Sequence, residues 1–146
     1  MLFPPGREGR WAAGSDDSRL LTELIDEISR NFSIDMDRIY LTGVADGGTA
    51  VWNLAAEYPD RWAAIVPVSS SPSPDLAARI AHLACWCFHG EYDPTIQNAR
   101  ATIKTLTDAG GHPRFTEVPG MGYDIWNQAY LNKELYTWLA EQRRQP

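Results

Sequence analysis

Apolar residues recur at helical spacing near the start of the chain and form short unbroken runs further along it. Between positions 19 and 32 they occupy 20, 21, 24, 25, 28 and 32, which lie on a single helical stripe. The acidic and hydroxyl residues at 16–18 suit its capped start. Later runs predict strands at 38–42, 62–68, 84–88 and 114–118, and helices at 47–58, from 75, at 96–109 and at 131–143.

This alternation of strands and helices predicts an α/β fold with about four mostly parallel strands and helices on both faces. In the last helix Leu135, Trp138 and Leu139 should point inward. Functional groups in such sheets collect on the loops that follow the carboxyl ends of the strands. We therefore expect the segments 45–46, 69–71, 91–94 and 121–124 to converge on one edge.

The segment Gly43-Val44-Ala45-Asp46-Gly47 joins the first predicted strand to the following helix. Its spacing matches the G-x-S-x-G elbow of serine hydrolases, in which glycines relieve crowding and a serine hydroxyl stands above the sheet. Here alanine occupies the serine position, and a methyl group cannot attack a carbonyl. The sequence predicts the turn without its nucleophile.

Composition is that of one globular domain spanning residues 1–146. The chain is 44% apolar, carries a formal net charge of −6, and has Arg143-Arg144 as its basic pair, so nucleic acid is not expected as a partner.

Residues 1–14 show no periodicity, and Met1 to Gly6 lack the apolar core of a secretory signal. No run approaches the roughly 18 apolar residues of a membrane span, so we expect no membrane contact and a cytoplasmic location.

Two cysteines, Cys85 and Cys87, lie two residues apart in a predicted strand. Side chains at this spacing point the same way and are poorly placed to form a disulfide with each other. Free thiols fit a reducing compartment, and core packing is the expected role of both.

Four stretches together resemble α/β-hydrolase esterases, in particular the polyhydroxybutyrate-depolymerase-like and dienelactone-hydrolase-like branch. They are RIYLTG at 38–43, AEYPDRWAAIVP at 56–67, FHGEYDP at 88–94 and PGMGYDIW at 119–126. The resemblance covers nearly the whole chain. It implies that Asp93 fills the acid position of a catalytic triad, Ala45 the nucleophile position and Tyr123 the histidine position, with Asp124 and Trp126 matching the same loop.

The resemblance also implies that the chain starts near the end of the family's fourth strand, so that the family's first strands and one arm of its oxyanion hole are absent. The backbone N–H of Asp46 would be the remaining oxyanion donor. The strand at 38–42 would become an open sheet edge that pairs with a second copy or with a separate chain.

Loss of a nucleophile or base costs a serine hydrolase a factor on the order of 10⁶ in turnover, so ordinary triad catalysis should be absent. Tyr123 is a weak substitute base, since a phenol has a reference pKa of about 10. Asp46, Glu91, Asp93 and Asp124 would crowd carboxylates at one edge, yet their spacing matches no metal motif, and no cofactor is expected.

Three hypotheses follow. The leading one is a non-catalytic or residually active relative of serine carboxylesterases, with a site for a small ester-like ligand among Ala45, Asp93, Tyr123 and Trp126. The second is an ester or lactone hydrolase that uses Asp93 or Tyr123 and the N–H of Asp46. The third is an interaction module that pairs through its open strand. Ser69 is expected in a polar loop near the site, and His89 in a structural role.

Overall fold

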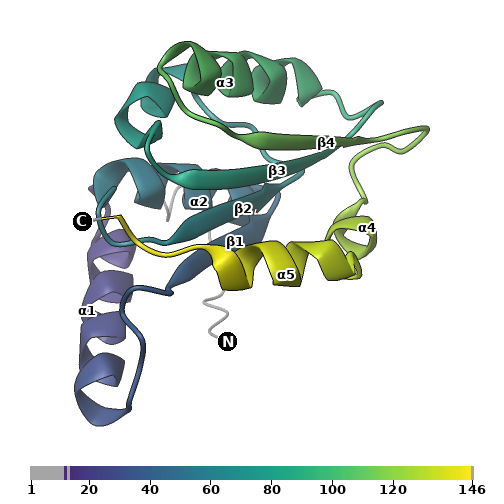
Figure 1. Ribbon diagram of the computed structural model, residues 1–146. Coiled ribbons are helices and arrows are strands. Elements are labelled where there is room, and N and C mark those ends of the chain that lie inside the picture. The colour runs from purple at the N-terminus through teal and green to yellow at the C-terminus, as the bar shows by residue number, and fades with distance from the viewer. Residues whose placement is uncertain (1–11, 13, 146) are drawn as a thin grey trace.

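The computed structural model describes residues 12 and 14–145, so the features noted at Met1 to Gly6 lie outside the described residues. The chain alternates between strands and helices as predicted, and α4 falls at the end of the loop predicted at 119–127. In chain order the elements are α1 (Asp16–Asn31), β1 (Tyr40–Val44), α2 (Asp46–Glu57), β2 (Ala64–Val68), the 3₁₀ helix η1 (Pro74–Ile80), β3 (Ala84–Gly90), α3 (Ile96–Asp108), β4 (Arg114–Val118), α4 (Trp126–Tyr130) and α5 (Lys133–Glu141) (Figure 1).

The four strands form one parallel sheet in the order β1-β2-β3-β4. Thr42 pairs with Val66 in the first ladder, Val68 with Phe88 in the second and Phe88 with Thr116 in the third. Every carboxyl end therefore lies at the same edge of the sheet, and the predicted α/β class is confirmed. The first strand begins two residues later than predicted, at Tyr40.

Successive residues of each strand point to opposite faces of the sheet. Both faces carry apolar side chains, and helices cover both of them. One face packs against α2, η1 and α3 in a buried cluster. Its largest members include Trp52, Trp62, Ile65, Ile80 and Leu106. The other face packs against α4 and α5 around Val66, Val68, Phe88, Ile125 and Leu135. Leu135 is buried as predicted, and Trp138 and Leu139 are half-buried against the same cluster.

The first helix buries only part of its apolar stripe. It starts earlier than expected, because Ser15 is its N-cap and accepts a hydrogen bond from the N–H of Ser18. Leu21 and Ile25 pack against the core, but the rest of the stripe does not follow them. Leu20, Leu24 and Phe32 are 51%, 39% and 69% exposed, so only part of the apolar stripe is buried.

The reason is the position of α1, which extends past β1 and beyond the sheet (Figure 1). Its stripe is wider than the surface that the described residues offer it. A salt bridge from Asp26 to Arg61 adds a polar attachment on the packed side. The exposed side of α1 therefore carries Leu20 and Leu24 among charged residues such as Glu23.

The last residues of the chain return to the start of β1. The backbone N–H of Arg144 donates to the carbonyl of Asp37 at 2.8 Å, and its guanidinium bonds to the Asp37 carboxylate. Tyr40 donates its hydroxyl to the carbonyl of Gln142. These contacts close the amino end of the sheet on the α5 side.

Both cysteines are free and buried in β3, and burial raises the pKa of each thiol. This agrees with their predicted packing role. Among the described residues, no helix is both long enough and apolar enough to cross a bilayer.

Candidate functional site

The four predicted loops meet at the carboxyl edge of the sheet, and backbone contacts hold them together. The N–H of Ala45 donates to the carbonyl of Val68 at 3.0 Å. The hydroxyl of Ser69 donates to the carbonyl of Tyr123 at 2.6 Å, and the N–H of Tyr92 donates to the carbonyl of Met121 at 2.8 Å. Segments far apart in the sequence thus form one continuous surface.

The elbow after β1 has a strained backbone at the nucleophile position. Ala45 lies at φ 56° and ψ −120°, between the last residue of β1 and the first residue of α2. A residue with a Cβ rarely adopts a positive φ, and holding its backbone in this conformation costs about 1–3 kcal/mol. The sharp strand-to-helix turn is therefore present at full strain although it presents only a methyl group.

The glycines around Ala45 have different reasons to be there. A Cβ at Gly43 would lie 2.4 Å from the carbonyl oxygen of Gly47, and one at Gly48 would lie 2.7 Å from the Cβ of Ser70. A Cβ at Gly47 would meet no atom within 4 Å outside its own helix. The expectation that crowding requires both glycines of the motif is correct for Gly43 and wrong for Gly47.

Asp46 begins α2, and its side chain is exposed. None of the described residues accepts a hydrogen bond from its backbone N–H, which belongs to the unpaired first turn of the helix. A carboxylate at this end also interacts favourably with the helix dipole. The N–H of Asp46 is thus available as a donor beside Ala45.

Asp93 follows β3 and is held in a buried position, with 3% of its surface exposed. Its Oδ1 accepts hydrogen bonds from both the N–H and the hydroxyl of Thr95, each at 2.7 Å. Its Oδ2 is buried and has no hydrogen-bond partner in the described part of the chain. One oxygen of the Asp93 carboxylate therefore accepts two hydrogen bonds from Thr95, and the other is unsatisfied.

His89 lies in β3 beside this carboxylate and is fully buried. Its Nε2 is 3.1 Å from the hydroxyl oxygen of Thr95 and 3.5 Å from Oδ1 of Asp93. Because the Thr95 hydroxyl donates to Asp93, it accepts from His89, which assigns the proton to Nε2. Burial lowers the pKa of His89, and the opposing effect of Asp93 is smaller. A neutral imidazole that steadies Asp93 agrees with the predicted structural role.

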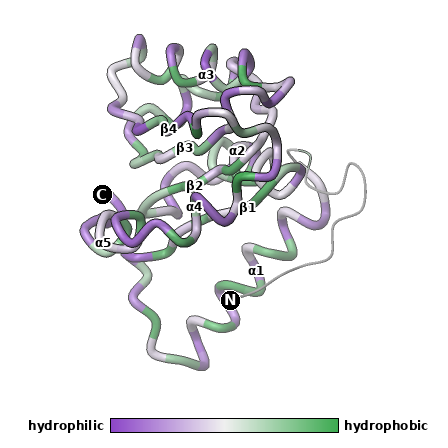
Figure 2. The backbone as a smooth tube through the Cα atoms, turned by 90° about the vertical axis from the view of Figure 1, so that its right-hand side faces the viewer, coloured by the Kyte–Doolittle hydropathy of each residue, from purple (hydrophilic) through white to green (hydrophobic). Residues whose placement is uncertain are grey.

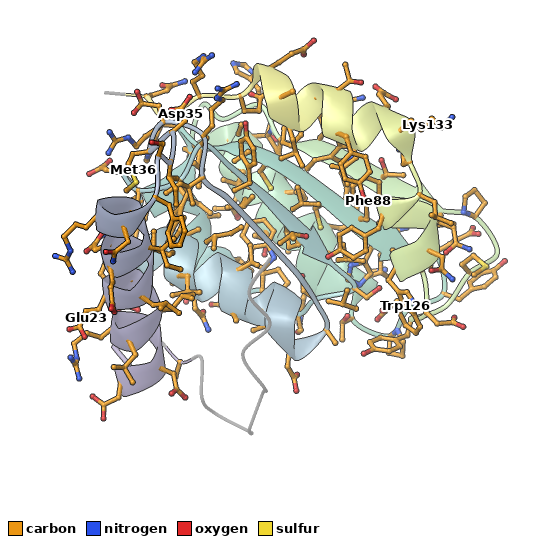
Figure 3. The ribbon with its side chains drawn as sticks, turned by 90° about the horizontal axis from the view of Figure 1, so that it is seen from below. Glu23, Asp35, Met36, Phe88, Trp126 and Lys133 are labelled. Atoms are coloured by element: carbon orange, nitrogen blue, oxygen red, sulfur yellow. The ribbon has the colours of Figure 1, made fainter. Side chains whose placement is uncertain are left out.

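Tyr123 does not take the place of a base beside Asp93. Its side chain is 47% exposed and packs edge to face against the ring of Trp126, with ring centres 6.1 Å apart. No hydrogen bond joins its hydroxyl to Asp93 or to any other residue that the structure describes. Trp126 is 39% exposed and points outward from α4 (Figure 3). The two rings form an aromatic pair at the rim of the site.

The remaining predicted site residues differ in exposure. Ser69 is buried, 3% exposed, and adopts a positive φ of 45°, so it ties the loop after β2 to the Tyr123 loop and is unavailable as a nucleophile. Its place in a loop near the site is as expected, and the hydroxyl is used inside that loop contact. Asp124 is exposed. Within the described residues no group of three His, Cys, Asp or Glu side chains is placed to hold a metal ion.

A hollow does occur in the structure, but at the opposite end of the sheet. Its lining includes Trp62, Leu83 and Gln142, which lie near the amino ends of β2 and β3 and at the end of α5. It contains none of the predicted site residues. The carboxyl edge therefore presents a surface of loops and rings, with Asp93 sealed beneath it.

Sequence reasoning missed two residues that shape this surface. Thr95 holds the acid, and the signal for it was the Asp-x-Thr spacing, which favours a local side-chain to backbone turn. Gly90 was also missed: a Cβ there would lie 1.8 Å from the carbonyl oxygen of Gly122, so the loop after β4 passes directly over the end of β3. Only the packed structure shows that contact.

Comparison with known proteins finds esterases. No protein-family model matches the chain. Over 70 residues it is 33% identical to poly(3-hydroxyalkanoate) depolymerase C of Paucimonas lemoignei. These 70 residues are 48% of this chain and 16% of that protein. It is 24% identical over 143 residues to a bifunctional acetylxylan esterase/xylanase of Neocallimastix patriciarum, covering 94% of this chain and 21% of the relative. The chain thus spans about a fifth or less of the length of these relatives.

The comparison with solved structures also finds an esterase and a serine hydrolase. A thermostable esterase superimposes with a TM-score of 0.82 at 31% identity, over 86% of this chain and 36% of the other. The fluorophosphonate-binding serine hydrolase F of Staphylococcus aureus superimposes with a TM-score of 0.73 at 16% identity, over 94% of this chain and 70% of the other. The second likeness bears on the fold alone.

Proposed function

We propose that this chain, which has the α/β-hydrolase, esterase-like fold of its relatives, is a non-catalytic relative of serine carboxylesterases that retains a binding surface at the carboxyl edge of its sheet. One observation carries the proposal. The elbow keeps its strained conformation, with Ala45 at φ 56°, but presents a methyl group where the reaction needs an oxygen nucleophile.

The other triad positions support the same conclusion. Asp93 is present, but its free oxygen is buried and has no partner among the described residues. A triad acid acts by orienting a histidine, and the side chain at that position is the exposed phenol of Tyr123. Without a histidine to orient, the Asp93 carboxylate cannot support the proton transfers of a catalytic triad.

The ligand we propose is a small ester-like molecule that is bound without being turned over. The N–H of Asp46 would donate to its carbonyl oxygen, and the exposed rings of Tyr123 and Trp126 would contact its apolar part. Asp46 and Trp126 lie on segments that converge at the same edge, which supports a single binding surface.

The alternative is an active ester or lactone hydrolase in which Asp93 or Tyr123 assists water and the N–H of Asp46 stabilises the oxyanion. The geometry favours this less. A general base must reach the proton it removes, whereas the Asp93 carboxylate is buried and Tyr123 shares no hydrogen bond with it in the described structure.

Hydrolysis of a short-chain p-nitrophenyl ester separates the two functions. We expect the purified chain and its Asp93→Asn variant to give equal rates, both close to the rate in buffer. Asn is the better test residue than Ala because its amide oxygen still accepts from Thr95. A rate well above buffer that collapses in Asp93→Asn would establish the alternative and refute the proposal.

A fluorophosphonate reagent tests for any nucleophilic serine at this edge. Its phosphorus forms a bond to an activated serine oxygen while fluoride leaves and the hydroxyl proton passes to a base. We expect no adduct on the wild-type chain by mass spectrometry, because Ser69 is buried and already donates its hydroxyl proton to a carbonyl. An adduct on the loop at 69–71 would contradict a non-catalytic function.

Restoring the missing groups should recover little activity. For Ala45→Ser combined with Tyr123→His we expect an increase in ester hydrolysis of less than about a thousandfold, since one N–H is only part of an oxyanion hole.

Ligand binding is tested separately by NMR. A methyl ester is titrated into the protein, and the shift of the Trp126 indole N–H signal is followed, with Trp126→Phe as the assignment control. No shift at saturating ester would refute the binding surface.

A further inference from the structure

The charged side chains are divided between the two edges of the sheet. An arginine lies at or shortly before the start of every strand, namely Arg38, Arg61, Arg79 and Arg114. Because the four strands are parallel, these arginines belong to the amino edge. Neither lysine nor arginine occurs in the stretches that contain the loops of the carboxyl edge, which are 39–60, 62–78, 80–99 and 115–132.

Carboxylates collect at the carboxyl edge instead. Figure 2 looks on to this edge, from the side on which α4 and the turn after β4 lie in Figure 1. Four carboxylates follow the strands here: Asp46 after β1, Glu91 and Asp93 after β3, and Asp124 after β4. All but Asp93 are exposed, and none of the four forms an ion pair with a lysine or arginine in the described part of the chain. The edge is therefore acidic.

Two basic side chains on neighbouring elements do not neutralise it. Arg100 of α3 interacts with Glu91 through space, but its guanidinium donates two hydrogen bonds to Glu117. Lys133 begins α5, and Figure 3 shows it well separated from Trp126. Uncompensated carboxylates on converging loops give this edge a negative potential that attracts cations.

Asp93 adds a buried charge whose second oxygen has no partner among the described residues. Its side chain is 2% exposed, and because Oδ1 accepts both bonds from Thr95, Oδ2 is turned away from Thr95. The N–H of Asp93 donates to the carbonyl of Gly90, which packs against Gly122 in the loop that carries Tyr123. The unpaired oxygen thus belongs to the same surface as the rings, and burial leaves its charge poorly screened.

The aromatic pair supplies the other half of a cation site. Tyr123 and Trp126 are 47% and 39% exposed, and their rings meet at 74° with centres 6.1 Å apart, which forms an open aromatic corner. Asp124 lies between the two residues in the sequence. A cation within about 6 Å of an aromatic ring centre is attracted to the face of the ring, most strongly for tryptophan.

We propose that the ester bound at this edge carries a positive charge, in a quaternary ammonium or protonated amine group that lies in the corner between Tyr123 and Trp126. The rings contact the apolar surface of this group, and the carboxylates of Asp124 and Asp93 supply the opposite charge. An ester with a negative charge is repelled by the same carboxylates. This inference rests on the proposed function and adds the charge of the ligand to it.

Two esters of the same shape test the inference. Acetylcholine carries a trimethylammonium group, whereas 3,3-dimethylbutyl acetate carries an uncharged tert-butyl group of almost the same size. Each is titrated into the full chain, and the indole N–H signal of Trp126 is followed by NMR. We expect acetylcholine to bind at least about tenfold more tightly than the neutral ester, because the cation–π and carboxylate interactions act on its charge.

The two esters also separate this inference from the proposed function. Equal affinities for acetylcholine and the neutral ester would overturn the cation site and leave the proposed binding surface intact. No shift with either ester at saturation would refute both.

A pair of variants tests the contribution of the local carboxylates. Asp124→Asn removes one charge at almost constant size, and it should weaken acetylcholine binding about threefold while leaving the neutral ester unaffected. Glu141→Gln is the matched control, because it makes the same change in net charge at an exposed position at the end of α5. Similar effects of the two variants would contradict a cation site at this edge.

Tyr123→Leu distinguishes a cation site from a merely apolar surface. Leucine keeps an apolar side chain at this position but has no ring face, so acetylcholine binding should weaken at least about threefold and binding of the neutral ester less than about twofold. Equal losses for the two esters would overturn the contact between the cation and the ring.

Discussion

The loop after β3 and the elbow after β1 lie at the same edge of the sheet but are held in place in different ways. The β3 loop keeps its functional group, because Asp93 is buried and held twice by Thr95. The elbow has the strained φ of Ala45 at its apex, where the side chain is only a methyl group. The two regions meet through packed loops and share no catalytic hydrogen bond in the described structure.

This difference shows that the backbone of the elbow is stabilised independently of the side chain at its apex. The backbone of the elbow is held by the close approach of Gly43 to Gly47 and by the bond from Ala45 to Val68, and neither involves a catalytic side chain. The conformation of the elbow therefore does not depend on a hydroxyl group at position 45. The acid loop is stabilised by side chains, so substitutions there should change both the position of Asp93 and the stability.

The largest expected effect breaks the elbow. Gly43→Ala should lower the free energy of unfolding by about 3 kcal/mol or more, because its Cβ would lie 2.4 Å from a backbone oxygen that cannot easily move. Gly47→Ala is the matched control, and it should be neutral or gain about 0.5 kcal/mol from helix propensity. Urea denaturation measures both, and equal effects would show that backbone crowding does not define the turn.

A smaller loss is expected in the acid loop. Thr95→Val removes the hydroxyl that donates to Asp93 and should lower stability by about 1–3 kcal/mol, since it leaves a buried carboxylate oxygen with one donor fewer. Thr107→Val is the control, because its exposed hydroxyl bonds only a helix carbonyl and should cost less than about 0.5 kcal/mol. Similar losses in the two variants would contradict the special role of Thr95.

The pH dependence of stability distinguishes the β3 region from the elbow. Burial lowers the pKa of His89 in the folded protein, so between pH 7 and 5 the unfolded chain binds a proton that the folded chain refuses. Stability should therefore fall as the pH is lowered through the ordinary histidine range. In His89→Gln the fall, measured by urea denaturation at each pH, should be shallower, and an unchanged slope would refute this origin.

The smallest expected effect is a gain at the elbow. Ala45→Gly should raise stability by about 1 kcal/mol, because glycine adopts the positive φ without strain and this relief exceeds its entropic cost. Ala101→Gly, in the exposed middle of α3, should instead lose about 1 kcal/mol. A loss at both positions would mean that the elbow stores little strain.

Much of the fold could be predicted because its signals are local. The parallel strands are short apolar runs, and every predicted strand is present, with no end displaced by more than two residues. The segments of the site could be predicted as well, since the carboxyl ends of parallel strands share an edge. The packing of α1 could not: its periodicity shows which side is apolar, but the exposure of Leu20 and Leu24 depends on what lies beside it.

The sequence by itself determined the alternation of elements, the elbow with alanine at its apex and the place of Asp93 in the loop after the third strand, because each depends on neighbouring residues. Only the tertiary structure decided that Asp93 is sealed with one oxygen unpaired, that Tyr123 turns outward against Trp126, and that Ser69 ties two loops together. Burial and hydrogen bonding between distant segments are properties of the packed chain, and local spacing does not encode them.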